Sequence, residues 1–182
     1  ELATIWGPDS TVGGWTEVRD GFPAVALKLF GPGTDSGTFD YFTDVINGEE
    51  GASRSDYSAS EDDNVTVQGV AGTGGGLGYL GFSYYEENLD TLKAVEIDSG
   101  EGCVAPSVAA AQDGSYAPLS RPLFVYVKSS SFERQEVEDF VGYILDNEAT
   151  IAEDSDFVPL NEDQLAEQRQ KFDDAVAGAD GS

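Results

Sequence analysis

The chain of 182 residues has no histidine, one cysteine and only nine lysine and arginine residues. Without histidine, Ser-His-Asp and Cys-His catalysis is excluded, and so are zinc sites made from histidine and cysteine. Cys103 has no second cysteine to pair with, so an internal disulfide is excluded. No apolar run reaches the length of a membrane span and no signal peptide is visible, which leaves the compartment open.

The scarcity of basic residues leaves a formal net charge of −26, because 35 aspartate and glutamate residues outnumber nine lysines and arginines. Such a chain offers no basic surface for nucleic acid, and an anionic membrane would repel it. The acidic residues are scattered along the chain, and their mutual repulsion is screened at about 1 M salt, where the Debye length is about 3 Å. We therefore expect a halophilic protein. The alternative is a merely acidic mesophilic protein.

Apolar residues make up 40% of the chain and aromatic residues 11%, enough for a folded core. Residues 23–31 predict a buried strand, and the spacing of Phe39, Phe42 and Ile46 predicts a helix that ends at Gly48. The other expected elements are strands over 64–72, 77–85, 93–97 and 122–128, a loop over 48–64 and a helical turn over 86–92. Strands that alternate with helices predict an α/β fold.

The C-terminal part is predicted to be mainly helical. Apolar residues recur there at helical spacing: Phe132, Val137, Phe140, Val141, Ile144 and Leu145. Asn161 and Gln164 fit a capping box, and Leu160 with Leu165 fits a hydrophobic staple, so a last helix is expected to begin at this point.

Two segments look like ligand-binding motifs but have the wrong spacing. "GTGGGLG" at 72–78 lacks the Gly-Lys-Ser/Thr ending of a P-loop and does not fit G-x-G-x-x-G, so it predicts a glycine-rich turn before a strand. "SEDDN" at 60–64 lacks the glycine and the distal glutamate of a calcium-binding loop and predicts a solvated charge run. We therefore expect neither a metal site nor a cofactor.

The stretch "LFGPGTDSGTFDYF" at 29–42 is the main candidate for a site. Ser36, Gly37 and Thr38 stand where the expected strand passes into the expected helix. The first N–H groups of a helix carry a partial positive charge, Gly37 lets an anion approach closely, and the two hydroxyls can donate to it. Alternatively, Ser36 only caps the helix, which contributes about 1 kcal/mol. Spacing alone leaves both interpretations open.

Several separated segments, taken together, resemble the phosphate-binding protein of the Pst ABC transporter. They are "GPGTDSGTFDYF", "GASRSDYSASEDDN", "VQGVAG…GLGYLGFSYYEEN", "VAPS…DGSYAPLSRPLFVYV" and "FVPL", in this order. The opening "ELATIWG…GGWTEVR" is similar to the stretch at which that family's chain enters its second lobe. The resemblance implies a periplasmic-binding-protein-like α/β lobe with a mixed sheet flanked by helices over residues 1–117. It also implies that 118–182 return towards a first lobe that this sequence lacks.

The resemblance further implies a function. It predicts a solute-binding component of an ABC importer, exposed in the periplasm or at the cell surface, which binds inorganic phosphate, delivers it to a permease and has no catalytic activity. Ser36, Gly37 and Thr38 match the family's phosphate-binding turn. The absent lobe implies association with such a lobe or with a second copy of the chain.

The positively charged side chain of the family's phosphate site has no direct counterpart in this sequence. The family's arginine stands four residues before the serine, where this sequence has Pro32, and Arg54 is the available substitute. The alternative for Arg54 is a surface residue paired with Asp56.

Three other functions stay open at this point. A receptor for another tetrahedral oxyanion such as sulfate would use the same turn. A phosphoryl-handling enzyme would explain the two glycine-rich turns, but the chain lacks a P-loop lysine and histidine. A structural or partner-binding domain would bind no anion at any salt concentration.

Overall fold

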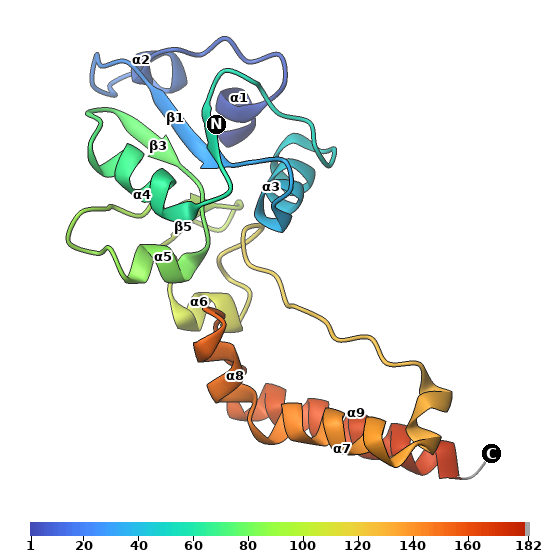
Figure 1. Ribbon diagram of the computed structural model, residues 1–182. Helices are drawn as coiled ribbons and strands as arrows, with labels where there is room; N and C mark the ends of the chain where they lie inside the picture. Colours follow the sequence, from blue (N-terminus) through green and yellow to red (C-terminus); the bar gives the residue numbers. More distant parts are fainter. Residues whose placement is uncertain (181–182) are drawn as a thin grey trace. The chain divides into compact units, whose positions relative to one another are not determined.

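The computed structural model describes residues 1–180, which form two compact units (Figure 1). The first unit comprises Glu1–Pro106 together with Tyr116–Leu119, and the second comprises Ser107–Ser115 and the chain from Ser120 onward. The domain division predicted between residues 117 and 118 stays a prediction. Within residues 1–180, no helix has both the length and the apolar character needed to cross a membrane.

A three-stranded parallel sheet lies at the centre of the first unit (Figure 1). Its strands are β1 (Lys28–Pro32), β2 (Ser58–Ser60) and β3 (Gly76–Gly78), in the order β2-β1-β3. Phe30 in the central strand is in register with Ser58 and Gly78. The α/β class predicted from the sequence is confirmed.

The expectation of one mixed sheet is corrected, because the antiparallel strands form a sheet of their own. β4 (Ile97–Asp98) pairs with β5 (Cys103–Val104). The Asp98 carboxylate accepts hydrogen bonds from the amides of Gly100 (2.8 Å) and Gly102 (3.0 Å), which close the turn between the two strands. This hairpin is a local structure and needs no partner from the parallel sheet.

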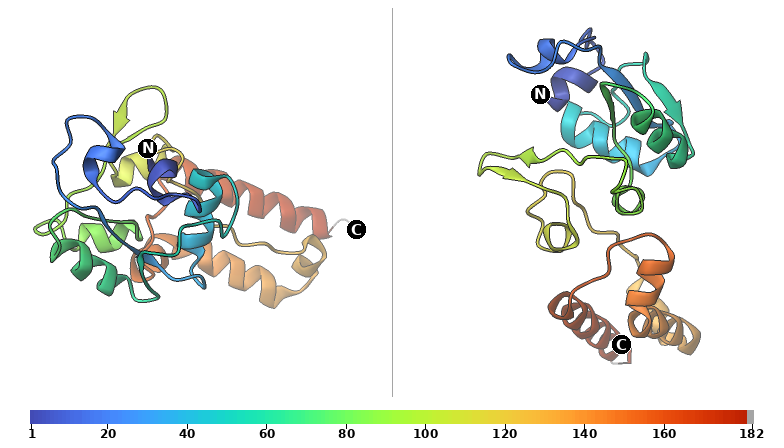
Figure 2. Two further views of the ribbon diagram at one scale, coloured as in Figure 1. Left: turned by 90° about the horizontal axis from the view of Figure 1, so that it is seen from above. Right: turned by 90° about the vertical axis from the view of Figure 1, so that its left-hand side faces the viewer.

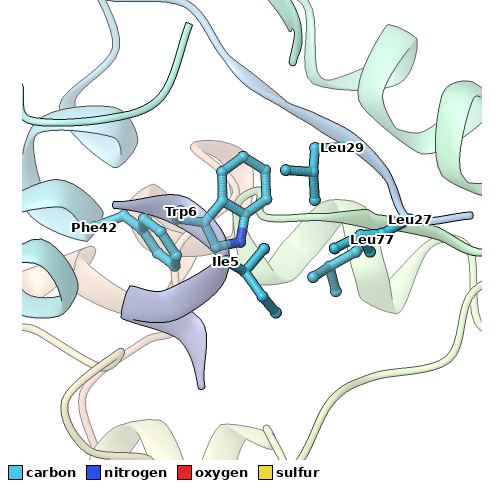
Figure 3. Close-up of a cluster of buried hydrophobic side chains, with 6 residues drawn as sticks. All are labelled: Ile5, Trp6, Leu27, Leu29, Phe42 and Leu77. Carbon is cyan, nitrogen blue, oxygen red and sulfur yellow. The ribbon is translucent and has the colours of Figure 1, made fainter. Parts of the chain in front are cut away.

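Helices cover both faces of the parallel sheet. Successive residues of a strand point to opposite faces, so each face presents side chains against which a helix can pack. Figure 3 shows the core on one face, formed by Ile5, Trp6, Leu27, Leu29, Phe42 and Leu77. This core joins the sheet to α1 (Leu2–Trp6) and α3 (Gly37–Phe42). On the other face, α4 (Asp63–Ala71) packs against Phe30 of β1. Two short helices, α2 (Trp15–Val18) and α5 (Phe82–Glu86), complete the unit.

The helix predicted from Phe39 to Gly48 is confirmed, with one irregularity. α3 passes directly into a π-helical segment, η1 (Thr43–Asn47). Thr43 is fully buried, and its hydroxyl donates to the Phe39 carbonyl (2.8 Å) and accepts from the Gly51 amide (2.8 Å). Gly48 ends the segment with φ of 83°, a conformation that glycine adopts without strain.

The strand predicted over 64–72 is wrong, because this segment is the helix α4. Alternating Val65 and Val67 favoured a strand, but the Asp62 carboxylate caps a helix by accepting from the Asn64 amide (3.0 Å). Val67 is buried whereas Val65 is 50% exposed, so one helix face covers the sheet. Packing against the sheet therefore overrides the strand preference of β-branched residues.

The close approach of α4 to β1 predicts a large effect at Gly69. A Cβ added there would collide with the Phe30 ring, because α4 lies directly over that side chain. Gly69→Ala gains about 0.5–1 kcal/mol of helix propensity but overpacks the site by about 1–3 kcal/mol, so we expect a net loss of stability. Gly74→Ala, where a Cβ meets nothing within 4 Å, is the matched control. Urea denaturation measures both, and equal stability of the two variants would contradict the packing described.

The remaining predictions for the first unit are partly right. The glycine-rich turn before a strand is confirmed, since Gly75 has φ of 86° and β3 follows at once. The strand predicted over 77–85 is limited to its first residues and gives way to α5, and the strand over 93–97 is reduced to the beginning of β4. The loop over 48–64 contains the short strand β2 and ends in the first turn of α4.

The second unit is mainly helical, as predicted. Its helices are α6 (Val108–Gln112), η2 (Ser129–Glu133), α7 (Gln135–Asp146), α8 (Glu148–Asp154) and α9 (Glu162–Asp180). α7 and α9 lie side by side (Figure 2). The predicted capping box is confirmed, because the Asn161 amide donates to Gln164 Oε1 (3.0 Å) and the Gln164 amide donates to Asn161 Oδ1 (2.9 Å).

The most strand-like segment of the sequence is not a strand. Residues 121–128 have no regular secondary structure, and Phe124 is 68% exposed. A strand needs a neighbour to pair with, and the described chain supplies none to this segment. The strand predicted over 122–128 is therefore wrong.

Candidate functional site

The order of the parallel strands defines where a ligand site is expected. From β1 the chain crosses to β2 on one side, and from β2 it crosses back through α4 to β3 on the other side. The helix after β1, α3, lies on the face of the core formed by Ile5 and Trp6, whereas α5, the helix after β3, contacts α4 on the opposite face. In open α/β sheets, ligands bind outside the carboxyl ends of the strands at such a switch point.

The turn of Ser36, Gly37 and Thr38 lies at this place, directly after the carboxyl end of β1. Ser36 has extended backbone angles (φ −93°, ψ 128°), and its hydroxyl oxygen accepts from the Thr38 amide (3.2 Å). Ser36 is thus the N-cap of α3, as one of the two interpretations predicted. A capping hydroxyl keeps its own hydrogen to donate, so capping and anion binding are compatible. Gly37 is exposed and its neighbours are half-buried, so a ligand can reach the turn.

Two aromatic residues fix the end of β1 from which the turn departs. The Tyr57 hydroxyl donates to the Pro32 carbonyl (2.8 Å), and the Tyr79 ring stacks on Phe42 at 3.9 Å between centroids. Burial, together with the neighbouring Tyr57, raises the pKa of Tyr79, so its phenol is neutral at physiological pH. The turn therefore follows a strand end that is fixed by uncharged aromatic side chains.

Glu61 lies against the turn and was not predicted as a site residue. Its Oε1 accepts a hydrogen bond from the Asp35 amide (3.4 Å), and its carboxylate occupies the space that a Cβ on Gly33 would need. Pairing of β1 with β2 brings it there, because the Gly33 amide donates to the Ser60 carbonyl (3.1 Å). The site consequently combines hydrogen-bond donors with one carboxylate acceptor.

Part of the "SEDDN" segment thus has a structural role that a solvated charge run does not describe. Asp62 caps α4, and Asp63 begins it. Burial raises the pKa of Asp63, and the charges of Asp62 and Glu61 raise it further.

Arg54 is an internal anchor in this structure. Its guanidinium is bound to both Asp56 oxygens (2.6 and 2.8 Å), and Nη1 donates to the Ile5 carbonyl (3.0 Å) and the Val12 carbonyl (2.9 Å). The alternative of an Asp56 pair is confirmed, but Arg54 is only 8% exposed and hence is not a surface residue. Anion binding by Arg54 stays a prediction that requires its guanidinium to leave these acceptors.

A hollow of about 330 Å³ beside Arg54 does not include the turn. Lys28, Asp56 and Ser58 line it together with Arg54, whereas Ser36, Gly37 and Thr38 do not. The structure therefore brings the three turn residues together and leaves Arg54 in a different environment.

The Arg54–Asp56 pair predicts a pH-dependent contribution to stability. The hydrogen bond from Arg54 lowers the pKa of Asp56 below its ordinary value near 4, so the contribution is full above that value and is lost as pH falls through the folded pKa. The Arg54 side chain is 7% exposed, but the Asp56 side chain is 68% exposed and water screens its charge, so Asp56→Asn is expected to cost about 1–2 kcal/mol at pH 7.

The difference between Asp56→Asn and the parent is expected to disappear in strong acid, as measured by urea denaturation across pH. Asp146→Asn is the control, because its partner Arg169 is 44% exposed and such pairs contribute about 0–1 kcal/mol. A pH-independent cost of Asp56→Asn would contradict the assigned ion pair.

Within residues 1–180, no group of three or more histidine, cysteine, aspartate or glutamate side chains is placed to hold a metal ion. The arrangement that the structure does contain is an open turn at a helix N-cap, on the switch point of a parallel sheet. This arrangement is typical of one class of protein, the α/β lobes that bind a small solute at the ends of their strands.

The sequence comparisons identify the family. Residues 9–148 match the model of a PBP superfamily domain, and the chain belongs to this superfamily. It is 42% identical to SphX of Synechococcus elongatus over 175 residues. This match covers 94% of this chain and 52% of SphX. It is 36% identical over 165 residues to the phosphate-binding protein PstS of Staphylococcus saprophyticus, covering 89% of this chain and 50% of PstS.

A solved structure has the same fold. The crystal structure of a possible phosphate binding protein from Planctomyces limnophilus matches with a TM-score of 0.89 and 43% identity, over 96% of this chain and 63% of that one. The resemblance to phosphate-binding proteins predicted from the sequence motifs is confirmed. The chain spans about half the length of the curated relatives it matches.

Proposed function

We propose that this chain is the phosphate-binding part of the solute receptor of an ABC importer, and that phosphate binds at Ser36, Gly37 and Thr38. The position of this turn, at a helix N-cap on the switch point of the sheet, carries the proposal. Hydroxyl and backbone donors at such a place suit an oxyanion. The names of the Staphylococcus and Planctomyces relatives support phosphate as that anion.

The same proposal implies binding partners and a cellular location for the protein. A receptor for an importer collects its solute outside the cytoplasmic membrane and delivers it to a permease, without catalysis of its own. The relatives continue well beyond the matched region, and we propose that a further lobe, or else a second copy of this chain, closes the site.

Glu61 favours phosphate over sulfate. At neutral pH phosphate carries at least one proton and can donate a hydrogen bond to a carboxylate, whereas fully ionised sulfate can only be repelled by it. The Glu61 carboxylate already accepts from the Asp35 amide beside the turn. Replacement by glutamine removes the negative charge, so Glu61→Gln should weaken phosphate binding and reduce the discrimination against sulfate.

Equilibrium dialysis with radiolabelled phosphate in multimolar KCl tests the proposal. Saturable binding that excess sulfate does not displace is expected, and incubation with phosphate esters should release no phosphate. Hydrolysis of esters would support a phosphoryl-handling enzyme, and the absence of any anion binding from low to high salt would support a structural domain. Either result would contradict the receptor.

We also propose that the protein is adapted to concentrated salt. With a net charge of −26, carboxylates repel one another across about 10 Å at 0.1 M salt but only about 3 Å at 1 M. The melting temperature is therefore expected to rise between dilute buffer and multimolar KCl or NaCl, as measured by circular dichroism. A melting temperature that falls steadily over this range would contradict salt adaptation.

A further inference from the structure

A hollow in the first unit lies apart from the proposed phosphate site. Its volume is about 330 Å³, and it is lined by Lys28 and Ser58, the first residues of β1 and β2, and by Asp56. The hollow therefore lies at the amino ends of two parallel strands, whereas the turn of residues 36–38 follows the carboxyl end of β1. Small-molecule sites have volumes of about 300–1,000 Å³, so the hollow can hold a small solute.

Arg54 fixes the Asp56 carboxylate at the edge of this hollow. Arg54 is 8% exposed, and its guanidinium donates to both Asp56 oxygens, at 2.6 and 2.8 Å. This contact lowers the pKa of Asp56, so the carboxylate is charged at neutral pH. Each carboxylate oxygen can accept more than one hydrogen bond, and the Asp56 side chain is 68% exposed. A ligand in the hollow can therefore still donate to Asp56.

Lys28 brings the opposite charge to the hollow. Within residues 1–180, Lys28 forms no ion pair, although the chain has 35 acidic and only nine basic residues. Phe30 is in register with Ser58. Lys28 and Asp56 each stand two residues earlier, so the same register brings them to neighbouring positions. Opposite charges placed in this way attract each other, but the Asp56 carboxylate is bonded to Arg54 instead. One hollow thus contains a cation and an anion that do not pair with each other.

These two charges match a ligand that carries both signs. A ligand carboxylate can accept hydrogen bonds from the Lys28 ammonium and the Ser58 hydroxyl, and a ligand ammonium can donate to Asp56. A simple anion would be repelled by Asp56, and a simple cation by Lys28. A zwitterion has no net charge, so the protein's net charge of −26 does not oppose its approach as it does for an anion.

We propose that the hollow binds a small α-amino acid as a zwitterion, with its carboxylate on Lys28 and Ser58 and its ammonium on Asp56. This site is additional to the phosphate site and does not depend on it, since none of residues 36–38 lines the hollow. The residues that line the hollow all belong to the first unit, so the site needs no further lobe. Because the three contacting side chains are exposed to water, we expect millimolar affinity.

Nitrogen-15 NMR of the 182-residue chain during a titration with glycine, in multimolar KCl without phosphate, tests the proposal. Saturable shifts are expected at the amides of Lys28, Asp56 and Ser58. Acetate and methylammonium each carry only one of the two charges and should bind about tenfold more weakly or less. Chloride competes equally with glycine and acetate for Lys28, and potassium equally with glycine and methylammonium for Asp56, so the ratios are independent of the salt.

Matched variants assign the contacts. Lys28→Gln should lower the affinity for glycine by about tenfold or more, because a hydrogen bond to a charged group is lost. Lys93→Gln removes the same charge from another exposed lysine of the first unit, outside the hollow, and should bind glycine as the parent does. Neither variant should change the melting temperature, since both side chains are exposed. Lys28→Gln should also leave phosphate binding unchanged, so failure of the amino-acid site is distinct from failure of the phosphate site.

Three results would overturn the proposal. The first is a glycine titration without saturable shifts at the hollow. The second is acetate binding as tight as glycine binding, which would make the hollow a site for simple anions. The third is an equal loss of glycine affinity in Lys28→Gln and Lys93→Gln, which would assign the effect to net charge and not to a contact in the hollow.

Discussion

Joining a first lobe to this chain is expected to raise its affinity for phosphate by several orders of magnitude. At an open turn, each hydrogen bond to the anion competes with water and contributes about 0.5–1.5 kcal/mol, or up to about 3 kcal/mol where a charge takes part. After the loss of translational freedom, a few such contacts give about −4 kcal/mol, or millimolar affinity. A second surface would add donors and exclude water, which strengthens every contact.

Calorimetric titration measures this gain on the 182-residue chain and on a fusion in which the part of Synechococcus elongatus SphX outside the match is joined ahead of Glu1. The short chain should bind at the millimolar level, and the fusion in the micromolar range or tighter. Titration with sulfate controls for a general effect of ionic strength. Micromolar affinity of the short chain would contradict the account of an open turn and would mean that the chain closes its own site, most simply by dimerising.

The second large effect is expected at Gly37. Valine there would place a branched side chain at the exposed start of α3, where an anion must approach the backbone, so Gly37→Val should lower the phosphate affinity of the fusion by about 100-fold or more. The fold should persist, because residue 37 is exposed and the core contacts of α3 come from Phe39 and Phe42. Calorimetry of the fusion, with the melting temperature recorded alongside, measures both.

Gly74→Val is the matched control for Gly37→Val. Gly74 precedes the amino end of β3, and a Cβ there meets nothing within 4 Å. The control should bind phosphate as the parent does. Unchanged binding by Gly37→Val would exclude the turn as the anion site.

The sequence predicted the helix and the helix cap of the candidate site because the signals for both are local in the chain. Phe39, Phe42 and Ile46 are spaced for one helix face, and Gly48 ends that helix by its own conformational freedom. The cap at Ser36 likewise involves only the Thr38 amide, two residues away. Such signals depend on neighbours in the chain, so they can be found without the fold.

Other features depended on contacts between distant residues. Arg54 donates to the carbonyls of Ile5 and Val12, more than 40 residues away, and its spacing to Ser36 gave no indication of this. Glu61 reaches the turn only because β1 pairs with β2. A sequence pattern records neither contact, so neither the buried hydrogen bonds of Arg54 nor the position of Glu61 beside the turn was predicted.

Two of the misassigned secondary-structure segments show different physical causes. Val65 and Val67 alternate as in a strand, but the Asp62 cap and the packing of α4 on Phe30 select a helix. The "SEDDN" segment already contained the cap, so this error was avoidable. Residues 122–128 have the composition of a strand, but no strand of the described chain pairs with them.

The central claim is that the turn at the carboxyl end of β1 holds the oxyanion. Nitrogen-15 NMR of the 182-residue chain during a phosphate titration in multimolar KCl tests it most directly, because each backbone amide reports separately. Saturable shifts are expected that are largest at Ser36, Gly37 and Thr38, with smaller shifts at Asp35 beside Glu61 and none of comparable size for sulfate. Shifts that centre instead on the hollow beside Arg54 and Lys28, with the turn unaffected, would contradict it.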